Sequence, residues 1–287
     1  MPGFEHFDDY RRFTESVLKR ARYRQEPFAD AFIKTVLETS KPRADTMKEG
    51  QVLFRAQRGA STRIVEYGDK IEIDAPHDSN RMVPTPERAI DGRVNPRGIP
   101  CLYLASNEAT AVAEVRPWVG SYVSLAEFKA MRDCKLLDCT RDKERRIAFV
   151  LHGLLTGSVN TSPENRERVV WGEIAYAFSK PVASDDRHSD YIPTQILAEA
   201  FKHYGYDGIA YRSLLGKEDG KNIALFDIPA ADLMNCCLYK INSVDFNFSQ
   251  SGGPYYVRKH YPEIRSQIDA SESRTTADEA DESDPPA

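Results

Sequence analysis

The sequence predicts an α+β fold, because short apolar strands are dispersed among amphipathic helices without the regular alternation of a doubly wound sheet. The chain has 287 residues, enough for one main domain whose core is buried without disulfides or metals. Its five cysteines form no CxxC pair and are odd in number, which argues against a zinc site and a secreted disulfide framework. We therefore expect a cytoplasmic protein with reduced thiols and no bound metal.

The formal net charge of −5 comes from the C-terminal segment 269–287, which carries seven acidic residues and one basic residue. Without that segment the chain has 38 basic and 37 acidic residues, so it offers no global electrostatic footprint for nucleic acid. The segment lacks aromatic and large aliphatic residues that would offset the entropy of ordering, so we expect residues 246–287 to be a mostly disordered acidic tail.

No apolar run approaches the roughly 20 residues that span a bilayer, and the first residues lack the pattern of a signal peptide. We expect no membrane insertion and no export.

The chain begins with a helical extension, residues 1–49. Apolar residues between Phe4 and Leu37 recur mostly at spacings of three and four, which predicts two helices broken near Gln25–Pro27. The main domain, residues 50–245, then opens with a strand at Gln51–Ala56. Arg55 lies inside this apolar run, where a charge is costly unless it meets a partner or a ligand. The alternative is a strand-edge arginine whose stem is covered and whose head is in water.

The connection 58–91 is polar and holds three prolines, with one strand expected at Lys70–Ile73. So long a connection in a compact domain is usually functional or disordered, and we interpret it as a flap beside the site.

The central stretch, residues 92–116, reads as a basic turn, a buried strand at Cys101–Ala105 and a helix of small residues. Ser106 or Asn107 can cap that helix, and Pro117 is expected to end it just after Arg116. The remaining predicted helices are Ile147–Leu155, Val169–Phe178 and Pro193–Tyr204. Two further pairs of strands are expected, Ser121–Ala126 with Lys135–Cys139 and Ile209–Ser213 with Asn222–Phe226. A last strand is expected at Cys236–Ile241.

Arg93 and Glu114 are the first candidate functional residues. Arg93 lies in a turn fixed by Gly92 and Pro96, and its planar guanidinium suits a phosphate or carboxylate. The alternative is a solvated loop arginine. Glu114 is the only acid among small or apolar neighbours on its helix, so its carboxylate either pairs with a cation or serves chemistry.

Ser213 and Tyr103 are weaker candidates when taken alone. Ser213 ends an apolar strand before a Gly-containing turn, a place for functional hydroxyls, although most such serines only satisfy local backbone groups. Tyr103 sits within an apolar run and can equally be a core aromatic. No GxSxG, GxGxxG, GxxxxGK[ST] or HExxH motif is present.

Read together, these segments resemble the RES-domain family, named for an Arg, a Glu and a Ser. The resemblance covers roughly residues 50–228 and is carried by Leu53–Ala56, Gly92–Ala105, Thr110–Val115, Asp207–Ser213 and Asn222–Phe226. It places the three name residues on Arg93, Glu114 and Ser213, with Arg55 and Tyr103 as substrate-binding residues.

The resemblance implies a fold like that of ADP-ribosyltransferases and an NAD-consuming enzyme that breaks the nicotinamide–ribose bond, with water or phosphate as acceptor. NAD would be a substrate rather than a bound cofactor, and phosphate would be a co-substrate in the second case. Many members are toxins held by a cognate Xre-type antitoxin, which makes such a protein a candidate partner. A homo-oligomer is left open.

Two other functions stay open at this point. One is an ADP-ribosyltransferase that modifies a macromolecule, and the other is a non-catalytic binding module in which Arg93 and Glu114 form a structural ion pair. The N-terminal extension, the 58–91 connection and the acidic tail depart from compact family members. The N-terminal helices would either occupy the surface that an antitoxin uses or pack as a permanent lid.

Overall fold

The computed structural model describes residues 3–67, 69–141, 162–180, 188–215, 220–246, 248–250 and 252–253. The chain divides into two compact units, Met1–Val244 and Asp245–Ala287, and the fold described below is that of the first. The helix expected at Ile147–Leu155 and most of the expected acidic tail lie outside the described residues.

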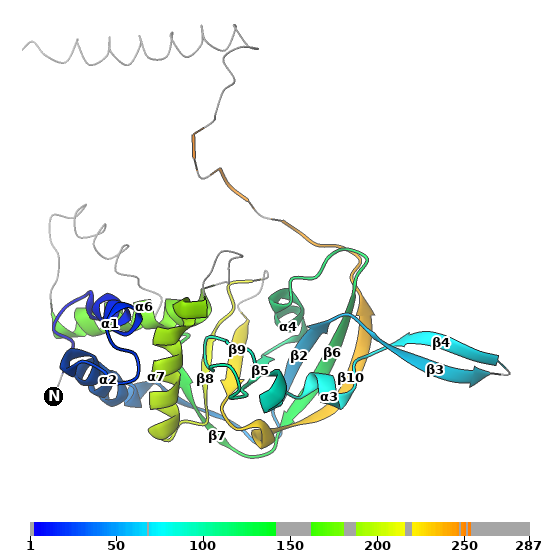
Figure 1. The fold of residues 1–287 in the computed structure, drawn as a ribbon, viewed down its shortest axis with the longest axis horizontal. Helices are drawn as coiled ribbons and strands as arrows, with labels where there is room; N and C mark the ends of the chain where they lie inside the picture. The colour runs from blue at the N-terminus through cyan, green and yellow to red at the C-terminus, as the bar shows by residue number, and fades with distance from the viewer. Residues whose placement is uncertain are drawn as a thin grey trace, which may run out of the picture. The chain divides into compact units, whose positions relative to one another are not determined.

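A mixed eight-stranded sheet forms the centre of the first unit (Figure 1). Its order is β1-β7-β8-β9-β5-β2-β6-β10, and of the strand pairs described only β7 and β8 are parallel. The strands are β1 Ala44–Met47, β2 Val52–Arg58, β5 Leu102–Ala105, β6 Tyr122–Ala130, β7 Cys134–Asp138, β8 Gly208–Arg212, β9 Lys221–Leu225 and β10 Ala231–Lys240. Helices segregated from a mostly antiparallel sheet confirm the α+β class.

Four helices pack together beside β7 and β8: α1 Asp9–Lys19, α2 Pro27–Thr39, α6 Pro163–Ser179 and α7 Ile192–His203 (Figure 1). Phe13 of α1, Phe32 of α2 and Trp171 of α6 lie in one buried cluster with Ile209 of β8. The two N-terminal helices are thus part of the main core, because their apolar faces are covered by the same helices that cover the sheet.

Short elements complete the unit. They are α3 Ser79–Met82, α4 Glu108–Glu114 and four 3₁₀ turns, η1 Lys41–Arg43, η2 Pro86–Arg88, η3 His188–Tyr191 and η4 Ile228–Ala230. Asn107 caps α4, since its side chain accepts a hydrogen bond of 2.8 Å from the backbone N–H of Thr110. No helix in the described part of the chain is both long and apolar enough to cross a membrane.

The 58–91 connection contains a two-stranded hairpin, β3 Ser61–Tyr67 and β4 Asp69–Ala75, which projects away from the main sheet (Figure 1). The sequence predicted part of β4 at Lys70–Ile73 and missed β3, whose charged and polar residues hide its alternation.

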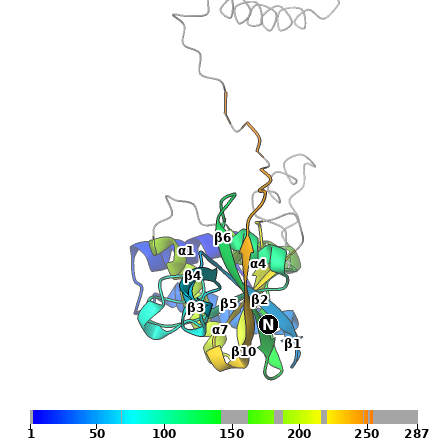
Figure 2. The ribbon, with the colours of Figure 1, turned by 90° about the vertical axis from the view of Figure 1, so that its right-hand side faces the viewer.

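Two other expectations were wrong. The predicted strands at Ser121–Ala126 and Lys135–Cys139 are β6 and β7, but they do not pair with each other. Strand β6 lies between β2 and β10 (Figure 1), and β10 is the edge strand that faces the viewer in Figure 2. Strand β7 lies between β1 and β8. Helix α4 also ends at Glu114 rather than after Arg116, because Arg116 has a φ of 47° and leaves the helical conformation.

Candidate active site

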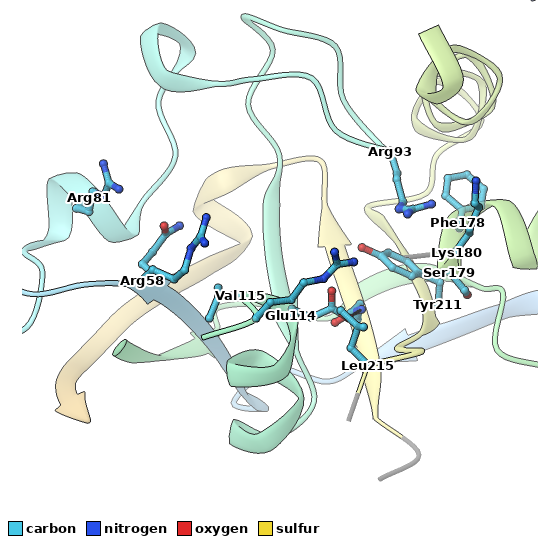
Figure 3. A pocket seen from close by; sticks show the side chains of 13 residues that line it. Arg58, Arg81, Arg93, Glu114, Val115, Phe178, Ser179, Lys180, Tyr211 and Leu215 are labelled. Carbon is cyan, nitrogen blue, oxygen red and sulfur yellow. Dashed lines mark hydrogen bonds between the residues drawn. The ribbon is translucent and has the colours of Figure 1, made fainter. Parts of the chain in front are cut away.

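Two adjoining cavities lie where α4, β2, β8 and β9 meet. One cavity, of about 560 Å³, has several basic residues in its lining (Figure 3), and we name it the outer cavity. The other, of about 500 Å³, has many aliphatic and aromatic residues in its lining together with Arg55 and Asp91, and we name it the inner cavity. Six of the described residues line both of them: Gln57, Arg93, Glu114, Val115, Tyr211 and Asn222. Arg93 and Glu114 therefore stand at the junction of a basic and a largely apolar compartment.

Glu114 is the last residue of α4, and its side chain is exposed. Its Oε1 accepts two hydrogen bonds, one of 2.7 Å from Ser213 Oγ and one of 2.6 Å from Asn222 Nδ2. Among the described residues no hydrogen bond reaches Oε2. The carboxylate is thus fixed through one oxygen, and the other is left for a ligand.

Arg93 reaches the same junction from the Gly92–Pro96 turn. Its Nη1 donates a hydrogen bond of 2.8 Å to the carbonyl oxygen of Ala177 in α6, and its guanidinium carbon lies 5.9 Å from the ring centre of Tyr191. No carboxylate of the described residues lies within 4.0 Å of it, and in particular no ion pair joins Arg93 to Glu114. Such a positive group beside a cavity is suited to an anionic ligand.

The turn that carries Arg93 is held by several hydrogen bonds. Asn95 is buried and donates from Nδ2 to the carbonyl oxygens of Ile90, Pro96 and Ile99. Gln195 of α7 donates to the carbonyl oxygens of Gly92 and Asn95 at 2.9 and 3.0 Å. A Cβ at Gly92 would lie 2.5 Å from Tyr103 Oη, so this position needs glycine for close approach.

Tyr103 supports the same turn while its ring lines the inner cavity. Its hydroxyl donates to Asn95 Oδ1 at 2.7 Å and accepts from the backbone N–H of Val94 at 3.1 Å. Burial raises the pKa of this hydroxyl well above its ordinary value. Both hydrogen-bonding functions of the hydroxyl are occupied, so the ring surface is what Tyr103 can offer a ligand.

Arg55 lies on β2, which is a central strand, and its Nε is buried rather than in water. Nη1 donates a hydrogen bond of 3.1 Å to the carbonyl oxygen of Tyr103, and the buried Nε has no partner among the described residues. Burial lowers the pKa of the guanidinium, with no described carboxylate to offset the loss of hydration. A buried cation with an unsatisfied donor is the arrangement that a bound anion or carbonyl would complete.

Ser213 follows β8 directly and is buried, at 9% exposure. Its Oγ contacts Glu114 and lies 3.0 Å from the carbonyl oxygen of Leu215, and it accepts a hydrogen bond from the N–H of the same residue. It lines neither cavity. Of the five residues singled out in the sequence, four thus line the inner cavity, and Ser213 lies behind Glu114 as its support.

The model of the RES domain family matches residues 69–248. This chain belongs to the RES-domain family. Arg93, Tyr103, Glu114 and Ser213 lie in the matched part, and Arg55 lies before it, on the strand β2 that pairs with β5 and β6.

A solved structure with a similar chain is the M. tuberculosis MbcT–MbcA toxin-antitoxin complex. The match has 15% sequence identity and a TM-score of 0.41, and it covers 71% of this chain and 92% of that chain. A comparison with curated proteins found no significant match.

Several residues at the site of this RES domain were not predicted. Asn222 is the second residue of β9 and lies opposite Tyr211 of β8 in the strand register. Both residues line the cavities. Asn222 is a buried polar residue at the start of a buried apolar run, and a polar residue in such a place is the signal that would have found it. The outer cavity also has Arg58, Arg81, Arg116 and Lys180 in its lining. In the sequence these four are ordinary surface cations, and only the fold brings them together.

Proposed function

We propose that this RES domain is an NAD-consuming enzyme that breaks the bond between nicotinamide and ribose, with water or phosphate as acceptor. The observation that carries the proposal is the carboxylate of Glu114, held through Oε1 by Ser213 and Asn222 at the junction of the two cavities. The RES-domain membership supports the same reaction.

The chemistry asks for such a carboxylate. Nicotinamide leaves as a neutral base from a cationic ring, so the transition state resembles an oxocarbenium ion, which a nearby negative charge stabilises. Fixing Oε1 keeps the charge in place, and Oε2 remains to contact the ribose or the incoming acceptor.

The two cavities suit the two parts of the substrate. The aromatic rings of Tyr103 and Tyr211 in the inner cavity would bind the nicotinamide end, and Arg55 and Arg93 would hold the pyrophosphate. Arg55 would thereby gain the partner that its buried Nε lacks. Positioning of this kind can lower the activation free energy by several kcal/mol, up to about 11 kcal/mol. We take the sheet and its helices to be an ADP-ribosyltransferase-like arrangement.

The test is to incubate the purified protein with NAD alone, with and without phosphate, and to measure free nicotinamide. We expect release of nicotinamide, together with ADP-ribose or ADP-ribose 1″-phosphate according to the acceptor. If nicotinamide appears only after a protein or nucleic acid is added, the chain is an ADP-ribosyltransferase that acts on a macromolecule, and our proposal is wrong.

Glu114→Gln separates catalysis from mere binding. The substitution keeps the size of the side chain and removes its charge, so nicotinamide release should fall about 100- to 1000-fold. In a non-catalytic binding module the variant would leave cellular NAD unchanged. The structural ion pair on which that alternative rested is absent between Arg93 and Glu114 in the described part of the chain.

We further propose that the protein acts as the toxin of a toxin–antitoxin pair, with an Xre-type antitoxin as its partner. Depletion of NAD would slow growth when the chain is expressed, and Glu114→Gln should relieve the effect. Growth inhibition that persists in this variant, at equal protein level, would contradict a toxicity caused by NAD cleavage.

A further inference from the structure

The outer cavity carries more positive charge than the pyrophosphate of a dinucleotide would neutralise. Among the described residues, its lining includes four arginines and Lys180 and a single carboxylate, that of Glu114. The pyrophosphate supplies two negative charges, and Arg55, which lines the inner cavity, would also bind them. Arg58, Arg81 and Arg116 have no carboxylate partner within 4.0 Å among the described residues. Arginines that repel one another around a cavity are stabilised when an anion enters it.

Arg58 and Arg81 are both held by anchored backbone. Arg58 ends β2, and its carbonyl oxygen lies 3.0 Å from Nε2 of His77, whose Nδ1 lies 3.0 Å from Ser61 Oγ. Arg81 belongs to α3, whose neighbouring residue Met82 is fully buried in the core. The 58–91 connection thereby brings Arg81 to the cavity wall.

The backbone of Arg116 has a conformation that residues other than glycine rarely adopt. Its φ is 47°, and Pro117 follows it, a neighbour that further restricts its backbone. Strain of this kind persists where the surrounding structure fixes it, often at ligand sites. Here the strained residue lines the outer cavity two positions after Glu114.

The arginines form separate groups around Glu114. In Figure 3, Arg58 and Arg81 lie on one side of Glu114, whereas Arg93 lies with Phe178 and Tyr211 on the other. Arginines on two sides of the one cavity suit it to two anionic groups of a ligand. A phosphate monoester, which carries about two negative charges at neutral pH, suits a cavity wall with several arginines better than a phosphodiester with one.

We propose that Arg58, Arg81 and Arg116 form a second anion subsite that binds a phosphate monoester on the adenosine ribose, so that the preferred substrate is NADP rather than NAD. The inference rests on the proposed cleavage of a nicotinamide dinucleotide and specifies its substrate.

The experiment compares nicotinamide release from NAD and NADP by the purified full chain, in phosphate-free buffer at fixed ionic strength. We expect kcat/KM for NADP to exceed that for NAD at least about tenfold, the size of one strong charged hydrogen bond. Arg58→Gln and Arg116→Gly should each reduce this ratio at least about tenfold. Glycine adopts the φ of position 116 without strain, so this variant should fold.

Arg63→Gln is the matched control, because Arg63 is an exposed arginine of β3 outside both cavities, and its ratio should equal that of the wild type. A wild-type ratio at or below one, or a ratio that the Arg58 and Arg116 variants do not change, overturns the proposal. Inorganic phosphate is then added to the NAD reaction. If it raises the rate to that with NADP, and Arg58→Gln abolishes this rise, the arginines bind free phosphate and the proposal is wrong.

Calorimetry with ADP-ribose and 2′-phospho-ADP-ribose tests the subsite without catalysis. We expect the phosphorylated compound to bind at least about tenfold more tightly, and Arg116→Gly to remove the difference. If the phosphorylated compound binds more tightly but neither dinucleotide releases nicotinamide, the proposed reaction is wrong and the anion subsite is supported. Nicotinamide release with equal binding of the two compounds would reject the subsite and keep the reaction.

Discussion

Ser213 Oγ lies 2.7 Å from Oε1 of Glu114, although the two residues are 99 positions apart in the chain. The contact joins the end of β8 to the end of α4. Asn222 reinforces it with a second hydrogen bond to the same oxygen. The proposed catalytic carboxylate is thus oriented by two strands that are neighbours in the sheet, which explains how a serine outside the cavities can matter to the chemistry inside them.

Replacing Ser213 with Ala should lower kcat more than it changes KM. The variant loses a hydrogen bond to a charged group, worth about 1.5–3 kcal/mol, so kcat should fall about 10- to 100-fold. KM for the dinucleotide should change less than about threefold, since the serine touches Glu114 and not the cavity. Steady-state kinetics measure both values.

Ser213→Thr keeps the hydroxyl and is the matched variant. It should recover most of the lost kcat, and its thermal unfolding should resemble that of the wild type. Equal kcat in the wild type and the Ala variant would show that Glu114 needs no support from this position.

Arg55→Met should separate stability from activity. The substitution keeps an unbranched stem and removes a buried cation with an unsatisfied Nε, so we expect the free energy of unfolding to rise by about 1–3 kcal/mol. Binding of the substrate should weaken about 100-fold if Arg55 holds the pyrophosphate. Urea denaturation and calorimetry with NAD measure the two effects. A less stable variant would mean that the guanidinium contributes to folding.

The sequence predicted the elements of this fold more readily than their arrangement. Spacings of three and four residues identified α1 and α2, and the apolar run at Cys101–Ala105 identified β5. The order of the sheet depends on long-range pairing, which local patterns do not encode. For this reason β6 and β7, consecutive in the chain, were wrongly expected to form a pair.

The residues of the candidate site likewise divide into those that the local sequence identified and those that only the fold brings together. Arg93 and Glu114 stood out because each has a distinctive local setting, a fixed turn and a helix of small residues. Arg58, Arg81 and Arg116 have no such setting and are charged residues of the usual kind in loops and at element ends. Only the fold brings β2, α3 and the residues that follow α4 to a common cavity.

Tyr103→Phe should destabilise the protein through the turn that carries Arg93. The variant leaves the N–H of Val94 and Oδ1 of the buried Asn95 without their partner, at a cost of about 1–3 kcal/mol. Tyr239→Phe, at an exposed tyrosine of β10, is the control and should change stability by less than about 0.5 kcal/mol. Equal urea midpoints for the two variants would show that the phenol hydroxyl does not support the turn.

Cys101 should make the stability of the protein fall at high pH. Its thiol is buried, lies 3.0 Å from the carbonyl oxygen of Leu225, and has its pKa raised by burial from 9.0 to about 12, with Arg55 opposing the rise. The unfolded chain therefore loses this proton near pH 9, while the folded protein keeps it until about pH 12. The contribution of the thiol is fully present below pH 9 and is lost as the pH rises from about 9 to about 12, at about 1.4 kcal/mol per pH unit.

The measurement is urea denaturation of the wild type and Cys101→Ala, under reducing conditions, between pH 7 and pH 10.5. Other buried thiols and tyrosines titrate in both proteins, so the difference between them isolates Cys101. That difference should be constant up to pH 9 and then shift in favour of the alanine variant by about 1–2 kcal/mol by pH 10.5. A difference that does not change over the whole range would mean that the thiol ionises as readily in the folded protein as in the unfolded chain. The burial of Cys101 directly before β5 and its contact with Leu225 argue against that outcome.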